Sequence, residues 1–282
     1  MNSHFLPPSS EFPNAPARAY VLGVGVSAID PAIAVRIIDS WIREGAHNYV
    51  CITGVHGVIE SRKDTTLRQI HNAAALVTPD GMPLVFMAHR LGFKDVKRVY
   101  GPDLMRHVSA LSAARGYRQF YYGGDIGVAD RLAATLQQQY AGLEVCGTYC
   151  PPFGEISAAE DEAAVAAINA SGADIVWIGL STPKQERWMA AHLDRLNAPV
   201  LIGVGAAFDF LAGTKPQAPT WMQRAGFEWL YRLYREPRRL WKRYGRIVPL
   251  FIVLAGLQLV RHSFGTHNAD ETVLTPHSRS SL

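Results

Sequence analysis

Short runs of apolar residues alternate along this chain with longer stretches in which apolar residues recur every three or four positions. The first pattern is typical of buried strands, and the second of helices that pack one face against a core. The runs predicted as strands lie at 20–24, 49–53, 75–78, 119–122, 143–148, 173–179 and 200–204. The stretches predicted as helices lie at 32–44, 83–91, 128–140, 160–171 and 183–196.

This alternation predicts an α/β fold, a Rossmann-like, mainly parallel sheet with helices on both faces. Ligands of such sheets bind beyond the carboxyl ends of the strands. We expect the α/β core at 18–214 and a basic, aromatic-rich helical appendage at 215–264. The proline-rich lead-in at 1–17 and the polar tail at 265–282 are predicted to be disordered.

The appendage changes the picture that composition alone gives. The 282 residues are 48% hydrophobic and carry a net charge of only +4, yet arginines and lysines crowd between 224 and 246, interleaved with tryptophan and tyrosine. The uncharged run at 247–260 is shorter than the ~20 residues that cross a bilayer. This combination favours docking at a membrane surface, with a buried terminal helix as the alternative. Basic residues confined to a terminal segment do not predict nucleic-acid binding.

Two glycine- or proline-rich turns follow predicted strands. At 178–186, Thr182 is a candidate helix N-cap with Gln185 closing a capping box, which makes either an anion site or only a well-capped helix. Gly123 and Gly124 would let a nucleotide approach the backbone. Neither the dinucleotide fingerprint nor a Walker phosphate loop is present, so an NAD-dependent oxidoreductase has little support.

Aspartates at two strand ends are the candidate polar groups. Asp80 before Gly81 is usually a turn residue, but a carboxylate at this edge can also act as a general base. Asp209, after Gly205, can accept hydrogen bonds from sugar or ribose hydroxyls, or can cap a tightly packed helix. The acidic cluster at 160–162 suits a helix start, and no D-x-D triplet occurs, so we expect no metal and no cofactor.

In order and spacing, these segments resemble the WecG/TagA/CpsF family of glycosyltransferases over about 20–254. The segments that match lie at 78–83 (TPDGMP), 98–104 (RVYGPDL), 123–127, 179–186 (GLSTPKQE), 203–209, 216–219 and 229–239. The resemblance implies an inverting, metal-independent transfer from a UDP-sugar to a polyprenyl-diphosphate-linked saccharide.

The resemblance also implies roles for individual residues. Asp80 matches the proposed catalytic base, and Thr53 matches a position near the sugar. Donor contacts are expected from Arg98, Gly123, Gly124, Thr182, Gln185, Gly205 and Asp209. Arg232, Arg235 and Arg239 are expected to face the diphosphate, where a fork of donors meets the charge that develops on departing UDP.

One departure concerns the donor. Many members of the family have asparagine where this chain has Val55, beside His56, so we expect a plain hexose donor and a role in exopolysaccharide synthesis. The alternative is UDP-N-acetylmannosamine or its uronic acid, as in teichoic acid or common antigen assembly. An alternative of another class is a non-catalytic, membrane-docked assembly protein.

The expected location is cytoplasmic, peripheral on the inner face of the cell membrane, because no basic-then-apolar leader is visible. The expected partners are the UDP-sugar, the lipid-linked acceptor and that membrane surface. A homo-oligomer is compatible with the sequence.

Overall fold

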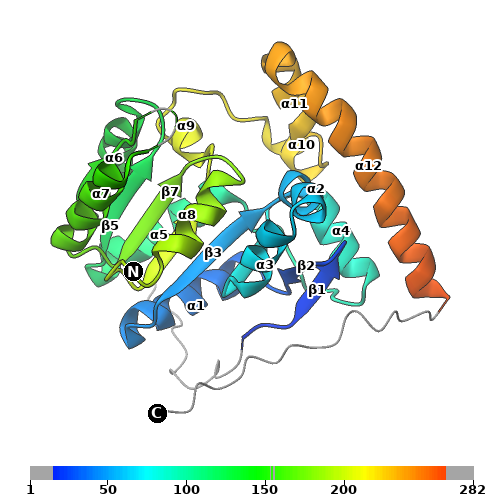
Figure 1. The fold of residues 1–282 in the computed structure, drawn as a ribbon, viewed down its shortest axis with the longest axis horizontal. Helices are drawn as coiled ribbons and strands as arrows, with labels where there is room; N and C mark the ends of the chain where they lie inside the picture. The colour runs from blue at the N-terminus through cyan, green and yellow to red at the C-terminus, as the bar shows by residue number, and fades with distance from the viewer. Residues whose placement is uncertain (1–14, 153, 155, 265–282) are drawn as a thin grey trace, which may run out of the picture.

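A six-stranded sheet forms the centre of the computed structural model, which describes residues 15–152, 154 and 156–264. The strand order is β4-β3-β8-β7-β5-β6, and every neighbouring pair is parallel (Figure 1). The strands are β3 (Asn48–Thr53), β4 (Leu76–Pro79), β5 (Arg118–Gly123), β6 (Glu144–Tyr149), β7 (Ile175–Gly179) and β8 (Val200–Gly203). The predicted fold class is confirmed, and each strand predicted from residue 49 onward forms.

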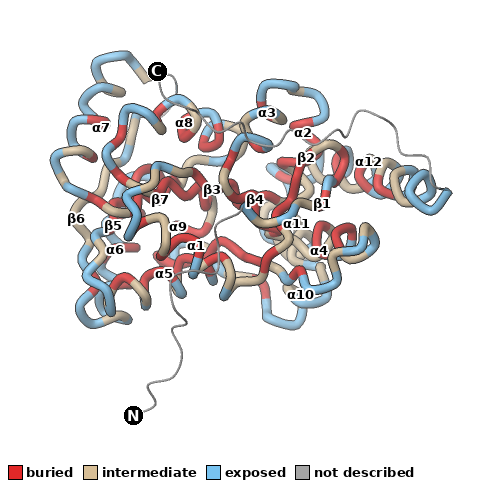
Figure 2. Tube along the Cα trace, turned by 90° about the horizontal axis from the view of Figure 1, so that it is seen from below, coloured by how far each residue is buried: buried red, intermediate tan, exposed pale blue. Residues whose placement is uncertain are grey.

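Helices cover both faces of this sheet, as the layers in Figure 2 show. One face carries α2 (Val55–Lys63), α3 (Thr65–Ala73), α7 (Ala158–Ser171) and α8 (Lys184–His192). The other carries α1 (Pro31–Glu44), α5 (Gly101–Arg115), α6 (Val128–Gln139) and α9 (Ala207–Leu211). Neighbouring strand residues such as Tyr121 and Tyr122 point into opposite cores, as the pleat requires.

The first predicted strand, 20–24, is a β-hairpin rather than a strand of the main sheet. Strands β1 (Arg18–Val21) and β2 (Val24–Ser27) pair antiparallel around Leu22 and Gly23, whose φ angles are 51° and 89°. Two positive φ angles are what a tight two-residue hairpin loop needs. The hairpin packs against α4 (Met82–Arg90) and reaches β4 through a 3.0 Å bond from the Val77 amide to Ser27 Oγ.

Four helices of the core, α2, α3, α5 and the five-residue α9, are not among those predicted. Helix α5 turns Ser109 and Ser112 into the core, where both bond the side chain of Gln119 on β5. Buried serines interrupt the apolar periodicity by which a helix is recognised. Helices α2 and α3 are short, and their sequences are mostly polar.

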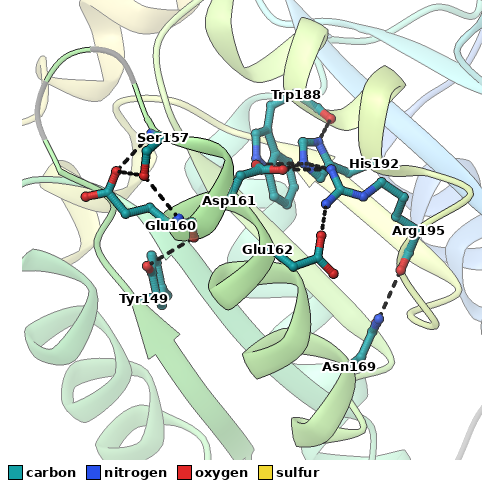
Figure 3. Close-up of polar contacts among 9 residues, drawn as sticks. All are labelled: Tyr149, Ser157, Glu160, Asp161, Glu162, Asn169, Trp188, His192 and Arg195. Carbon is teal, nitrogen blue, oxygen red and sulfur yellow. Dashed lines mark hydrogen bonds and ion pairs between the residues drawn. The ribbon is translucent and has the colours of Figure 1, made fainter.

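The acidic cluster at 160–162 is structural, as expected. Glu160 forms a capping box with Ser157 at the start of α7. Asp161 accepts from His192 Nε2 at 2.8 Å, and Arg195 bridges Asp161 and Glu162 at 2.7 Å each (Figure 3). These contacts join α7 to the C-terminal end of α8. The cluster therefore holds two helices together on one face of the sheet.

The appendage consists of α10 (Thr220–Arg224), α11 (Glu228–Arg235) and α12 (Pro237–Ser263). Helix α12 lies beside α2 along the edge of the molecule (Figure 1). It buries Ile247, Phe251 and Ala255 in the core, so the appendage is docked. Gln258 clamps it to the hairpin, accepting from the Leu22 amide at 3.0 Å and donating to the Tyr20 carbonyl at 2.6 Å.

Helix α12 is longer than the apolar run at 247–260 found in the sequence, because it also includes the basic residues before that run. Among the described residues it is the one helix long and apolar enough, by length and composition, to cross a membrane. Only Leu240, Ile247, Phe251 and Ala255 of this helix are buried, and apolar residues such as Ile252, Val253, Leu257 and Val260 are exposed. The disorder predicted at 1–17 and 265–282 falls, except at 15–17, on residues outside those that the structure describes.

Candidate active site

A cavity of about 1640 Å³ opens at the carboxyl ends of the sheet strands. The segments that follow β3, β4, β5, β7 and β8 all contribute to its wall, and α11 and α12 close it from the outside. This is the edge at which parallel sheets bind ligands. Of the predicted site residues, Asp80, Arg98, Gly124, Thr182, Gln185, Gly205, Asp209, Arg232, Arg235 and Arg239 line the cavity. Thr53 and Gly123 do not.

Asp80 stands one residue beyond β4, held by its backbone. Its amide donates to the Thr53 carbonyl at 3.0 Å, and its Oδ1 accepts from the Gly101 amide at 3.4 Å. Burial raises the pKa of Asp80 to about 6, against the attraction of Arg98 and with the help of the Glu228 carboxylate. A carboxylate of this kind is ionised at neutral pH yet basic enough to accept a proton.

Arg98 joins Asp80 to the appendage. Its Nε donates to the Asp80 carbonyl, and its Nη2 forms a 2.5 Å ion pair with Glu228 of α11. Tyr100 supports the pair, since its hydroxyl donates to Glu228 at 3.1 Å and its ring lies 4.0 Å beneath the guanidinium. Although burial opposes it, the carboxylates of Asp80 and Glu228 raise the pKa of Arg98. The appendage is thus tied through Arg98 to the sheet edge that carries Asp80.

The turn before α8 differs from the predicted cap. The Thr182–Pro183 peptide is cis, α8 begins at Lys184, and Pro183 stands in the N-cap position. The Lys184 and Gln185 amides bond the Ser181 carbonyl, so the predicted Thr182 cap and Gln185 capping box were wrong. Thr182 Oγ1 donates instead to Glu186 at 2.8 Å.

Gln185 is nevertheless placed for a ligand. It is 3% exposed, and its Nε2 donates to Glu186 Oε1 at 3.2 Å. Its Oε1 has no hydrogen-bond partner in the part of the chain that the structure describes. Buried acceptors are nearly always satisfied, so an acceptor left open in a cavity wall indicates a place for a donor group of a ligand.

The glycines of this edge serve two different purposes. Gly123 has φ 110°, and a Cβ there would lie 2.9 Å from the backbone of Gly179, so it allows two strands to converge. Gly124 and Gly205 line the cavity, both with positive φ.

Asp209 is bound by its own loop. Its carboxylate pairs with Lys215 at 2.7 Å and accepts a hydrogen bond from Thr214 at 3.1 Å.

The segment after β3 holds the remaining candidates. Thr53 is 2% exposed, and its hydroxyl donates to the Cys51 carbonyl at 3.4 Å. Val55 and His56 both line the cavity. Burial, aided by nearby Arg243, lowers the pKa of His56 to about 4, so its imidazole is neutral at pH 7.

The appendage presents arginines to the same cavity. Arg232 is half-buried over the ring of Phe210, while Arg235 and Arg239 are exposed, with Arg239 paired to Glu236 at 2.5 Å. Arg243 was not among the predicted residues, yet it lines the cavity, and its Nε is buried with no partner among the described residues. Arg232, Arg239 and Arg243 recur at helical spacing, the signal that could have identified Arg243.

Sequence reasoning also missed Glu228 and Tyr100, which lie 128 positions apart and meet only in the fold. No group of three or more His, Cys, Asp or Glu side chains in the described ranges is arranged to hold a metal ion.

The chain is similar to known proteins over most of its length. The model of the Glycosyl transferase WecG/TagA/CpsF family matches residues 19–265. The chain is 29% identical over 186 residues to proteins of Staphylococcus aureus strains MW2 and COL, covering 65% of this chain and 70% of each relative. Both are named N-acetylglucosaminyldiphosphoundecaprenol N-acetyl-beta-D-mannosaminyltransferase.

Proposed function

Because the chain belongs to the WecG/TagA/CpsF family of glycosyltransferases, we propose that it moves an N-acetylmannosamine-type sugar from UDP to N-acetylglucosamine on a polyprenyl diphosphate. The relatives support this donor class better than the plain hexose and exopolysaccharide role expected from Val55. The observation that carries the proposal is Asp80, a carboxylate with a raised pKa in a large cavity closed by arginines.

The proposed reaction is a single displacement with inversion. Asp80 takes the proton of the acceptor hydroxyl as that oxygen attacks the anomeric carbon, and the bond from this carbon to the UDP oxygen breaks with its electron pair leaving on UDP. Arg98 places the Asp80 backbone and keeps the appendage closed over it. Thr53, through its carbonyl, holds the Asp80 amide.

The donor is proposed to lie toward β5, β7 and β8, along Gly124, Thr182, Gln185, Gly205 and Asp209. The open Oε1 of Gln185 supports this assignment. The charge that develops on UDP is proposed to be met by guanidinium groups of Arg232, Arg235, Arg239 and Arg243 rather than by a metal. Arginine suits this task because its planar fork binds phosphate oxygens bidentately.

We propose that the protein docks on the membrane that carries the acceptor. Exposed apolar residues of α12 lie beside exposed Trp241 and the basic residues of the appendage, a combination that binds at the interface of an anionic bilayer. The acceptor would then reach the cavity from the α12 side.

UDP release tests the proposal, with purified protein, a synthetic polyprenyl-diphosphate-linked N-acetylglucosamine and a panel of UDP-sugars, EDTA being present throughout. We expect release with UDP-N-acetylmannosamine that requires the acceptor, survives EDTA and is lost in Asp80→Asn. Asp103→Asn, an exposed aspartate of α5 paired with Arg106, is the matched control and should remain active.

Release with UDP-glucose alone would return the donor assignment to a hexose. Inhibition by EDTA would overturn the metal-independent mechanism. No release with any donor, from folded protein and a competent acceptor, would favour the non-catalytic assembly protein.

A further inference from the structure

The cavity does not end at the arginines but continues as an apolar groove between α4 and α12. Its wall includes Phe86 of α4 and Phe251, Ile252, Ala255, Gly256 and Leu259 of α12, which we call the α4–α12 groove. No ionisable residue lies between Ile247 and Val260, a length of about 20 Å at ~1.5 Å per residue. The groove is therefore long, its α12 wall carries no ionisable side chain, and it is continuous with the site.

Parts of this wall are exposed although they are strongly apolar. Phe86 is 56% exposed and Ile252 is 64% exposed, and both line the same cavity as Asp80. Gln258, the polar residue within the run, turns away to the hairpin, where it bonds Tyr20 and Leu22. The clamp fixes α12 at this end, so the groove is held by the fold and does not depend on a ligand to form.

Three chemistries follow one another along the cavity, and their order identifies the occupant. Asp80 lies at the sheet edge near Arg232, and along α12 the cavity-lining Arg239 and Arg243 precede the apolar residues of the wall. An acceptor made of a sugar, a diphosphate and an isoprenoid chain has the same order, so the basic start of α12 would face the acceptor's diphosphate as well as that of UDP. Resting on the proposed function, we propose that the α4–α12 groove binds the isoprene units nearest the acceptor's diphosphate.

The groove can be blocked without disturbing its framework. A Cβ added at Gly256 would meet nothing within 4 Å, so Gly256→Trp places a large side chain in open space at the groove wall. Val253→Trp is the matched control: it adds the same side chain to the same helix, at a residue that is 59% exposed and is not part of the cavity wall.

The experiment uses two soluble acceptors with the same N-acetylglucosamine diphosphate head, one ending in farnesyl and one in methyl, without bilayer or detergent. Binding is measured by calorimetry and transfer by UDP release. For the wild type we expect the farnesyl acceptor to bind at least about tenfold more tightly, the effect of burying roughly two methylene groups. Gly256→Trp should remove most of this preference and leave the methyl acceptor unchanged, while Val253→Trp should keep it.

Equal binding of the two acceptors by the wild type, as expected if the lipid chain stays in the bilayer, would overturn the inference. So would equal losses in Gly256→Trp and Val253→Trp. Groove-dependent binding of the farnesyl acceptor without any UDP release would instead support the groove as an isoprenoid site and contradict the proposed activity.

Discussion

Asp80→Asn should stabilise the folded protein while abolishing transfer. The carboxylate has a pKa of about 6 in the fold and an ordinary value of 3.8, a difference that corresponds to roughly 3 kcal/mol. Folding therefore favours the protonated form. The resulting penalty is fully present above pH 6, shrinks as the pH falls through 6, and is gone below 3.8.

Asparagine removes this penalty and keeps an oxygen for the Gly101 amide. At pH 8 we expect the variant to be more stable by up to about 3 kcal/mol, or roughly 5–10 °C in melting temperature for a chain of this size. At pH 5 the advantage should be clearly smaller. Urea denaturation of the wild type and the variant at both pH values measures the difference.

Asp209→Asn serves as the control, because it breaks the 2.7 Å pair with Lys215 and should give no gain at either pH. An Asp80→Asn protein that is no more stable than the wild type at pH 8, or whose advantage is the same at pH 5, would refute the reasoning. In the same wild-type protein, kcat/KM should rise with pH through an apparent pKa of about 6.

Two substitutions and one truncation test the appendage. Glu228→Gln removes a negative charge that raises the pKa of Asp80, so the acidic limb of the pH–rate profile should move to lower pH; an unmoved limb would contradict the contact. Arg243→Gln should lower kcat/KM by roughly 10- to 100-fold, the effect of one charge-assisted contact, while the exposed Arg238→Gln should change it little in the same assay. A chain ending at Thr214 should stay soluble and bind UDP in calorimetry but lose transfer, and intact transfer would remove the arginines from the mechanism.

The sheet could be predicted because its strands are buried on both faces and so appear as continuous apolar runs. The hairpin at 18–27 could not be distinguished from one strand, because Leu22 is an unusual residue for a positive φ. Helix α5 was missed because Ser109 and Ser112 point into the core toward Gln119. In α5, the apolar pattern was interrupted by polar contacts that form only in the folded core.

In the site, too, some features could be predicted from the sequence and others depend on contacts made in the fold. Asp80 could be placed at a strand end from sequence, but its role came from the family resemblance, since burial and Glu228 are what distinguish it from a turn residue. The Thr182 cap failed because Pro183 takes the N-cap position. Glu228 read only as one of two acids among many arginines, and its partner Arg98 is 130 positions away.

The clamp made by Gln258 has a consequence for the order in which the protein folds during its synthesis. Its partners, Tyr20 and Leu22, lie 238 and 236 positions earlier in the chain, so they leave the ribosome long before it does. Chains are synthesised at ~5–20 residues per second, and the N-terminal part can fold meanwhile. The hairpin therefore waits, for on the order of ten seconds or more, before α12 can cover it. Helix α12 is synthesised after the other elements that line the cavity, so the cavity is complete only once α12 has left the ribosome.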